Sequence, residues 1–130
     1  MDELSLNMYQ KQAMRTAGIY EDTADKLINT ALGLSGETGE ISDHIKKVIF
    51  QGHSLDKLYL LNELGDVLWY IALGADALGY TLQDVAAYNI VKLQKRYPDG
   101  FSVERSLNRE EEQNNGYQQL TLDSCNPQHP

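Results

Sequence analysis

The sequence predicts an all-α protein, a subunit built as a bundle of four to five helices. Apolar residues recur at steps of three and four along long stretches of the chain, which is the spacing of a buried helix face. Helix start and stop residues separate these stretches, and no segment alternates convincingly as a strand does. A chain of 130 residues can form one domain with its own core. We therefore expect 1–109 to form that domain and the polar segment 110–130 to form a flexible tail.

Four helices are predicted in chain order. They cover 1–18, then 23–50, then a segment capped by Ser54 or Asp56 that ends near Leu78, and finally a segment capped by Thr81 that ends at Tyr97. Gly79 ends the third helix, and the turn 98–100 stops the fourth.

Three glycines, Gly33, Gly36 and Gly39, fall inside the second predicted helix. Each costs roughly 1 kcal/mol relative to alanine in a helix interior. Their density has three explanations: close approach by another backbone or a ligand, a local break in the helix, or tight helix packing alone.

Composition limits the function classes. The formal net charge is −8 and the isoelectric point is about 4.7, which disfavours general nucleic-acid binding. The one cysteine, Cys125, fits a reducing compartment. The longest apolar run, 67–75, is too short to span a membrane, and no secretory signal is recognisable, so we expect a cytoplasmic protein without a membrane partner.

Two acidic pairs dominate the sequence. Glu37 and Glu40 form the first pair, and Glu63 and Asp66 form the second. A spacing of three residues places both members of a pair on one helix face. One such pair is usually a solvated face, but these two lie on consecutive predicted helices, beside apolar stripes and glycines. If the helices pack side by side, four carboxylates converge, and a hard divalent ion, Mg²⁺ above all, would neutralise them.

Basic and aromatic residues suggest a phosphate or base contact. Lys92 and Arg96 on the fourth helix can reach a phosphate chain, although basic residues near a helix C-terminus also favour the helix dipole. Asn89 lies within an apolar stripe, so it either contacts a ligand or caps a neighbouring helix. Tyr70, one turn beyond Asp66, stacks on a base, donates to a phosphate, or packs in the core.

These motifs together resemble the MazG-like nucleotide pyrophosphohydrolases, members of the all-α NTP pyrophosphatase superfamily. The resemblance covers roughly 4–109 and rests on the order ExxE, a spacer of 22 residues (41–62), ExxD, and a later helix with Asn, Lys and Arg. Its segments read LGLSGETGEI over 32–41, ELGDVLWY over 63–70 and NIVKL over 89–93, followed by RYP over 96–98. Where the family often carries another acid before the first pair, this chain has Gly36.

The resemblance implies Mg²⁺-dependent hydrolysis of a nucleoside triphosphate, with a dNTP expected, to the monophosphate and pyrophosphate. It implies metal ligation by Glu37, Glu40, Glu63 and Asp66, and phosphate contacts from Asn89, Lys92 and Arg96. Glu37 or Glu40 would orient or deprotonate the attacking water. It also implies a homodimer or homotetramer with sites near subunit contacts, and a role in nucleotide-pool control or housecleaning.

Two alternatives stay open. The first is phosphoribosyl-ATP pyrophosphohydrolase, a relative in the same superfamily. The second is a non-catalytic helical module that binds a nucleotide or a protein. A di-iron carboxylate bundle is disfavoured because such sites use Glu-x-x-His pairs, whereas Glu40 and Asp66 stand at the corresponding positions.

Overall fold

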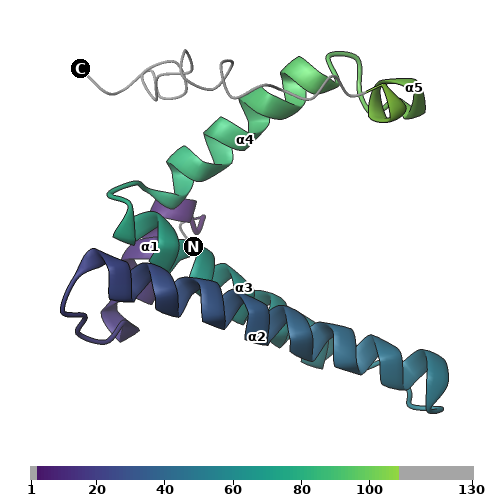
Figure 1. Cartoon of the computed structure of the whole chain (residues 1–130), viewed down its shortest axis with the longest axis horizontal. Helices are drawn as coiled ribbons and strands as arrows, with labels where there is room; N and C mark the ends of the chain where they lie inside the picture. Colours follow the sequence, from purple (N-terminus) through teal and green to yellow (C-terminus); the bar gives the residue numbers. More distant parts are fainter. Residues whose placement is uncertain (1–2, 109–130) are drawn as a thin grey trace. The chain divides into compact units, whose positions relative to one another are not determined.

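The computed structural model describes residues 3–108, which form helices and no strand. This confirms the predicted all-α class. The elements are α1 (Leu6–Ala13), a short 3₁₀ helix η1 (Met14–Thr16), α2 (Thr23–Phe50), α3 (Lys57–Ala77), α4 (Leu82–Arg96) and α5 (Val103–Leu107) (Figure 1). The chain divides into two compact units between Leu82 and Gln83. That 1–109 form one domain stays a prediction, and the predicted tail 110–130 lies outside the described residues.

In the first unit, α2 and α3 lie side by side and form a helical hairpin (Figure 1). The helix bounds match the predicted stripes, with Asp22 and Asp56 as the capping residues. Asp22 accepts from the amide of Asp25 at 2.8 Å, and Asp56 accepts from the amides of Leu58 and Tyr59 at 3.0 Å each. These carboxylates satisfy amides that have no partner within the helix, which fixes where each helix begins.

The glycines of α2 do not interrupt it, because the helix runs unbroken from Thr23 to Phe50. Gly33 has a clear steric role, since a Cβ atom there would overlap the ring of Tyr70 on α3. Gly36 and Gly39 differ, because a Cβ atom at either position would meet nothing within 4 Å. Close approach within this chain therefore explains one of the three glycines.

The first helix is shorter than the predicted span 1–18. It ends at Ala13 and tightens into η1. The hydroxyl of Thr16 donates to the Ala13 carbonyl at 2.6 Å, and the indole N–H of Trp69 donates to the same carbonyl at 3.3 Å and to Thr16 Oγ1 at 2.8 Å. Side-chain donors thus satisfy the carbonyl that a continuing α-helix would use.

The best-packed part of the first unit lies where α1 meets α3. The side chain of Gln10 is nearly fully buried and makes three hydrogen bonds there. Its Nε2 donates to the carbonyls of Ala72 at 3.3 Å and Tyr80 at 3.2 Å, and its Oε1 accepts from the amide of Leu82 at 2.8 Å. One side chain therefore ties α1 to the end of α3 and to the chain that follows it.

The second unit contains most of α4 and all of α5. The turn predicted at 98–100 is present, with Gly100 at φ 92° and its amide donating to the Tyr97 carbonyl at 3.1 Å. The helix α5 was not predicted. Its signal is Ser102, whose hydroxyl accepts from the amide of Arg105 at 3.3 Å as an N-cap.

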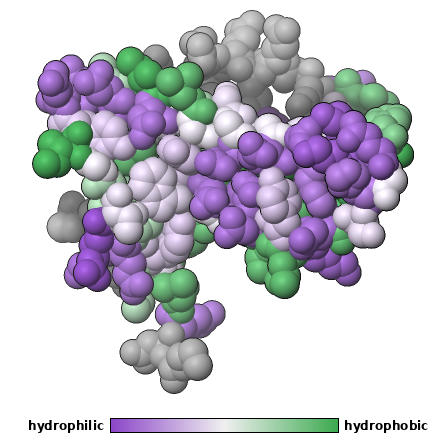
Figure 2. All heavy atoms as spheres, turned by 90° about the horizontal axis from the view of Figure 1, so that it is seen from below, coloured by the Kyte–Doolittle hydropathy of each residue, from purple (hydrophilic) through white to green (hydrophobic). Residues whose placement is uncertain are grey.

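Much of the apolar surface is exposed. Among the described residues only Ala72, Leu73, Ala75 and Leu82 form a buried hydrophobic core, whereas large side chains such as Leu32 (68% exposed) and Leu58 (77%) face outward. Figure 2 shows hydrophobic side chains among hydrophilic ones on one face of the molecule. Within residues 3–108, no helix is both long and apolar enough to cross a membrane.

Candidate metal centre

The two acidic pairs lie on the two helices of the hairpin. Glu37 and Glu40 belong to α2, and Glu63 and Asp66 belong to α3. Both helices are continuous through these positions, so each pair spans about one turn of its helix. The hairpin therefore fixes the backbone from which all four carboxylates project.

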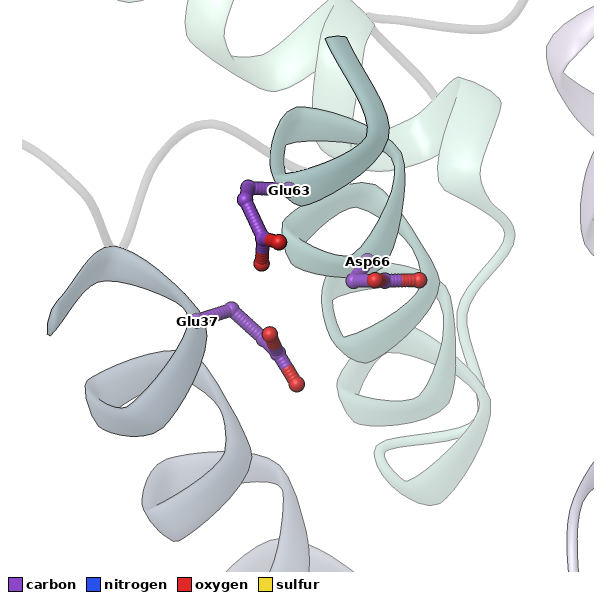
Figure 3. Close-up of side chains that lie close together, drawn as sticks. All are labelled: Glu37, Glu63 and Asp66. Carbon is purple, nitrogen blue, oxygen red and sulfur yellow. The ribbon is translucent and has the colours of Figure 1, made fainter. Parts of the chain in front are cut away.

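Three of the four carboxylates come together. Glu37, Glu63 and Asp66 each offer an oxygen, and these oxygens all lie within 4.8 Å of one another. Figure 3 shows Glu37 reaching from α2 toward the two acids of α3. Glu63 is buried, at 7% exposure, Glu37 is half-buried, and Asp66 is exposed. The cluster is thus closed on one side and open to solvent at Asp66.

Electrostatics within this cluster favour a positive ion. Burial raises the pKa of Glu37, and the nearby charge of Asp66 and a hydrogen bond with Glu63 raise it further. Carboxylates this close cannot all ionise without repulsion unless a cation lies among them. Oxygen donors from carboxylates are what hard divalent ions such as Mg²⁺ prefer. The donor set of Glu37, Glu63 and Asp66 therefore fits such an ion.

Glu40 has a different environment. Its Oε2 accepts a hydrogen bond from the hydroxyl of Tyr59 at 3.2 Å, and its side chain is exposed. It still lies close enough to Glu37 for its charge to contribute to the raised pKa of that residue. The two members of the first acidic pair therefore differ. Glu37 belongs to the cluster, whereas Glu40 accepts a hydrogen bond from Tyr59.

Sequence reasoning did not single out Tyr59. Burial and the nearby charge of Glu63 raise the pKa of the Tyr59 phenol to about 12, so this hydroxyl keeps its proton at neutral pH. Its ring lies 5.0 Å from the ring of His44, whose Nε2 accepts from the amide of Asp56 at 3.0 Å. The signal for Tyr59 was its position four residues before Glu63, which places it on the same face of α3. His44 acts here as an acceptor for a backbone amide.

Two other residues approach Asp66. The side-chain amide of Asn62 donates to Asp66 Oδ2 at 3.5 Å. Burial and the charge of Asp66 raise the pKa of Tyr9 on α1. A hydrogen-bond donor such as Asn62 can orient a carboxylate for ligation. Neither residue was predicted, because their positions depend on how the helices pack.

Tyr70 packs between the hairpin helices. Its ring occupies the space that Gly33 leaves open, and it meets Trp69 edge-on with ring centroids 5.0 Å apart. The alternative of a packed tyrosine thus has structural support. Contact between Tyr70 and a substrate stays a prediction.

The predicted phosphate-binding residues lie on α4. Asn89 is exposed, and Lys92 and Arg96 are half-buried. Asn89 stands in the predicted apolar stripe of α4, but its neighbour Ile90 is itself 53% exposed. The part these three residues take in the site stays a prediction.

The fold and this cluster define a class of protein, in which an all-α chain presents carboxylates from two neighbouring helices to a hard divalent ion. The MazG nucleotide pyrophosphohydrolase domain family matches residues 26–101, a range that contains both acidic pairs and all of α4. The chain belongs to this family, which confirms the predicted resemblance and indicates nucleotide pyrophosphohydrolase activity in general.

One curated relative is the Gene 37 protein of Mycobacterium phage L5. It is 35% identical to this chain over 106 residues, which cover 75% of this chain and 92% of that protein. Its name states no activity. No solved structure was found to match the chain.

Proposed function

We propose that this protein hydrolyses a nucleoside triphosphate, with dNTPs as the preferred class, to the monophosphate and pyrophosphate in a Mg²⁺-dependent reaction. Family membership supports the reaction class. The observation that carries the proposal is the convergence of Glu37, Glu63 and Asp66 within 4.8 Å from two helices. We further propose a cytoplasmic role in nucleotide-pool control or housecleaning.

In this proposal Glu37, Glu63 and Asp66 hold the ion, together with Glu40. When bound, Mg²⁺ neutralises triphosphate charge, stabilises the leaving pyrophosphate and lowers the pKa of the attacking water. The water oxygen forms a bond to the α-phosphorus, and the bond from that phosphorus to the oxygen bridging to the β-phosphorus breaks. Glu37 or Glu40 orients the water and accepts its proton.

The substrate is held by a second set of residues. Lys92 and Arg96 bind phosphate oxygens through charge-assisted hydrogen bonds. Asn89 contributes an amide to the same side. Tyr70, one turn from Asp66, contacts the base or a phosphate with the part of its side chain that the hairpin leaves accessible.

Product analysis tests the reaction class. The wild-type protein is incubated with Mg²⁺ and each of the eight common dNTPs and NTPs, and pyrophosphate is resolved from orthophosphate. We expect monophosphate and pyrophosphate from at least one dNTP, and loss of both products in Asp66→Asn. The matched control is Asp25→Asn, which neutralises an exposed acid in the first turn of α2.

Other outcomes of that experiment contradict parts of the proposal. Phosphoribosyl-ATP is included as a ninth substrate. If it alone is turned over, the dNTP assignment is wrong and the protein is a phosphoribosyl-ATP pyrophosphohydrolase. Tight nucleotide binding without any product would favour the non-catalytic module. Full turnover by Asp66→Asn would remove the proposed metal site.

We also propose that the working form is a homodimer or homotetramer, in which further copies cover the exposed apolar faces. On α2, Ile28 is 56% and Leu32 is 68% exposed, and on α3, Leu61 is 65% and Leu64 is 56% exposed. Apolar surface of this extent usually marks an interface. The open space beside Gly36, Gly39 and Gly65 also suits close approach of another helix, since small residues allow backbones to come near.

Sedimentation measurements on single variants test the assembly. Leu32→Glu places a charge on the exposed face of α2 and is expected to shift the protein toward monomer. Ile19→Glu is the matched control, because Ile19 is 103% exposed in the connection before α2. A wild-type protein that stays monomeric at high concentration would contradict the proposal.

A further inference from the structure

The geometry points to Tyr59 as a positioning residue of the metal centre: its hydroxyl holds the Glu40 carboxylate against α3 and so sets the affinity of the site for a divalent cation. This inference rests on the proposed function, because it takes the acidic cluster to be a cation site.

Glu40 is separate from the cluster of three acids. Among the described residues, the acids whose oxygens lie within 4.8 Å of one another are Glu37, Glu63 and Asp66. Glu40 lies one turn along α2 and accepts from the Tyr59 hydroxyl through its Oε2 atom. Its second carboxylate oxygen is left for a cation or for a cation-bound water. An exposed Glu side chain loses considerable rotamer freedom when it is ordered, so a prior contact lowers the entropy lost on ligation.

Tyr59 is itself held in place. Its backbone amide donates to the capping carboxylate of Asp56 at 3.0 Å. Its ring lies against the ring of His44, with centroids 5.0 Å apart and planes inclined by 40°. His44 in turn accepts from the amide of Asp56 at 3.0 Å. The cap of α3 therefore holds the backbone of Tyr59, and the Tyr59 ring lies against a histidine of α2 that contacts the same capping residue.

The register of the two helices places His44 and Tyr59 next to the carboxylates. His44 follows Glu40 by one turn on α2, and Tyr59 precedes Glu63 by one turn on α3. Because α2 and α3 are antiparallel, His44 is displaced from Glu40 in the same direction as Tyr59 is from Glu63, toward the connection 51–56. The aromatic pair therefore forms a layer directly next to the carboxylates. This layer links the cap of α3 to the fourth acid of the site.

The test is a metal titration of the full chain without nucleotide, with Mn²⁺ as the probe and free Mn²⁺ followed by electron paramagnetic resonance. Tyr59→Phe removes the hydroxyl and keeps the ring on His44, so the fold is expected to survive. We expect the dissociation constant for Mn²⁺ to rise about tenfold, the size usual for losing a residue that orients a ligand. The matched control is Tyr20→Phe, which removes a hydroxyl that accepts from Asn29 at 2.8 Å. That control is expected to bind Mn²⁺ as the wild type does.

A double-mutant cycle separates positioning from a general effect on structure. If Tyr59 acts through Glu40, the tenfold loss disappears when Tyr59→Phe is made in a Glu40→Gln background. An equal loss in both backgrounds, or wild-type affinity in Tyr59→Phe, overturns the inference. In the enzymatic assay, we expect the Mg²⁺ concentration for half-maximal rate to rise in Tyr59→Phe and to stay at the wild-type value in Tyr20→Phe.

The same titration distinguishes failure of the inference from failure of the proposed function. If the wild type binds Mn²⁺ and Glu63→Gln does not, the cation site is supported, whatever Tyr59→Phe shows. Wild type that binds no Mn²⁺, or Glu63→Gln that binds as wild type, overturns the cation site and the role of Tyr59 with it.

Discussion

The two ends of the α2–α3 hairpin differ sharply in packing. At the end near α1, residues 72–75 of α3 are buried and Thr30 of α2 is buried against Gly74, whose added Cβ would lie 2.8 Å from Thr30 Cγ2. At the end near the connection 51–56, Leu58 and Leu61 of the same helix are 77% and 65% exposed. One helix thus contains both the best-packed segment of the unit and one of its most exposed apolar faces.

This difference separates the packed contacts from the proposed site along one hairpin. The packed end holds the helices together through contacts within the chain. The acids lie near the middle of both helices, beside exposed apolar side chains such as Leu64. Glu63 marks the change, because it is a buried carboxylate between the exposed and the packed halves of α3. A buried charge of this kind lowers stability unless it is paired, so the site is expected to reduce the stability of the ion-free protein.

The largest expected effect is the loss of activity in Glu63→Gln. Removing this ligand is expected to lower kcat/KM by more than about a hundredfold, because the cation and the charge stabilisation it supplies are lost. The same substitution relieves repulsion in the cluster, so the thermal midpoint in EDTA is expected to equal or exceed that of wild type. Kinetics and thermal unfolding on one preparation check both. A destabilised variant would mean that Glu63 belongs to the packed end.

The next effect concerns the packed end. Gln10→Ala removes the side chain that pairs with the Tyr80 carbonyl and the Leu82 amide, and it removes a second donor to the Ala72 carbonyl, which α3 itself also satisfies. Groups that lose their partners in buried surroundings typically cost 1–3 kcal/mol each, with partial relief from water, so we expect a loss of roughly 2–4 kcal/mol. Urea unfolding measures this loss. Gln12→Ala, at an exposed position of α1, is the control, and an equal loss there would contradict the account.

A pair of glycine substitutions compares a packed position of α2 with an open one. Gly33→Ala forces a Cβ into the ring of Tyr70 and is expected to destabilise by about 1–3 kcal/mol. Gly36→Ala meets no atom of this chain within 4 Å and is expected to stabilise the isolated helix pair by about 0.5–1 kcal/mol. Unfolding measured in dilute solution gives both values. If Gly36→Ala instead weakens self-association, that face is covered by another copy.

The smallest effect is a pH dependence of stability in the absence of metal. The pKa of Glu37 is raised above its ordinary value of 4.5, so the folded chain binds this proton more tightly than the unfolded chain does. The contribution of Glu37 to the free energy of unfolding is therefore greatest at low pH, and it falls as the pH rises through the raised pKa. In EDTA, the thermal midpoint of Glu37→Gln minus that of wild type is expected to grow as the pH rises from 4.5 to 7. A difference that does not change with pH would contradict the raised pKa.

The sequence predicted the helices well because their signals are local. Asp56, Gly79 and the turn at 98–100 mark boundaries through residues a few positions apart, and the stripe of α2 specifies its whole length. The end of α1 was missed because the Trp69 indole, 56 residues from Ala13, satisfies a carbonyl there. Long-range hydrogen bonds of this kind leave no periodic pattern in the sequence.

The sequence predicted only part of the candidate site, because only the spacing along each helix is a local signal. Spacing along each helix placed the four acids in two pairs, and packing of the hairpin brings Glu37, Glu63 and Asp66 together. Spacing alone did not show that Glu40 is held by Tyr59, because that contact depends on the rotation of α2 against α3. Side chains that act across helices are therefore the part of a site that sequence periodicity detects least.

The short connection between α2 and α3 has a consequence for the order in which the protein is made. The clustered acids all lie between positions 37 and 66, and the hairpin is complete at Ala77. Contacts across a short loop lose little chain entropy and form quickly. Because synthesis proceeds from the N-terminus, the two helices that carry the clustered acids leave the ribosome before α4, which carries Lys92 and Arg96.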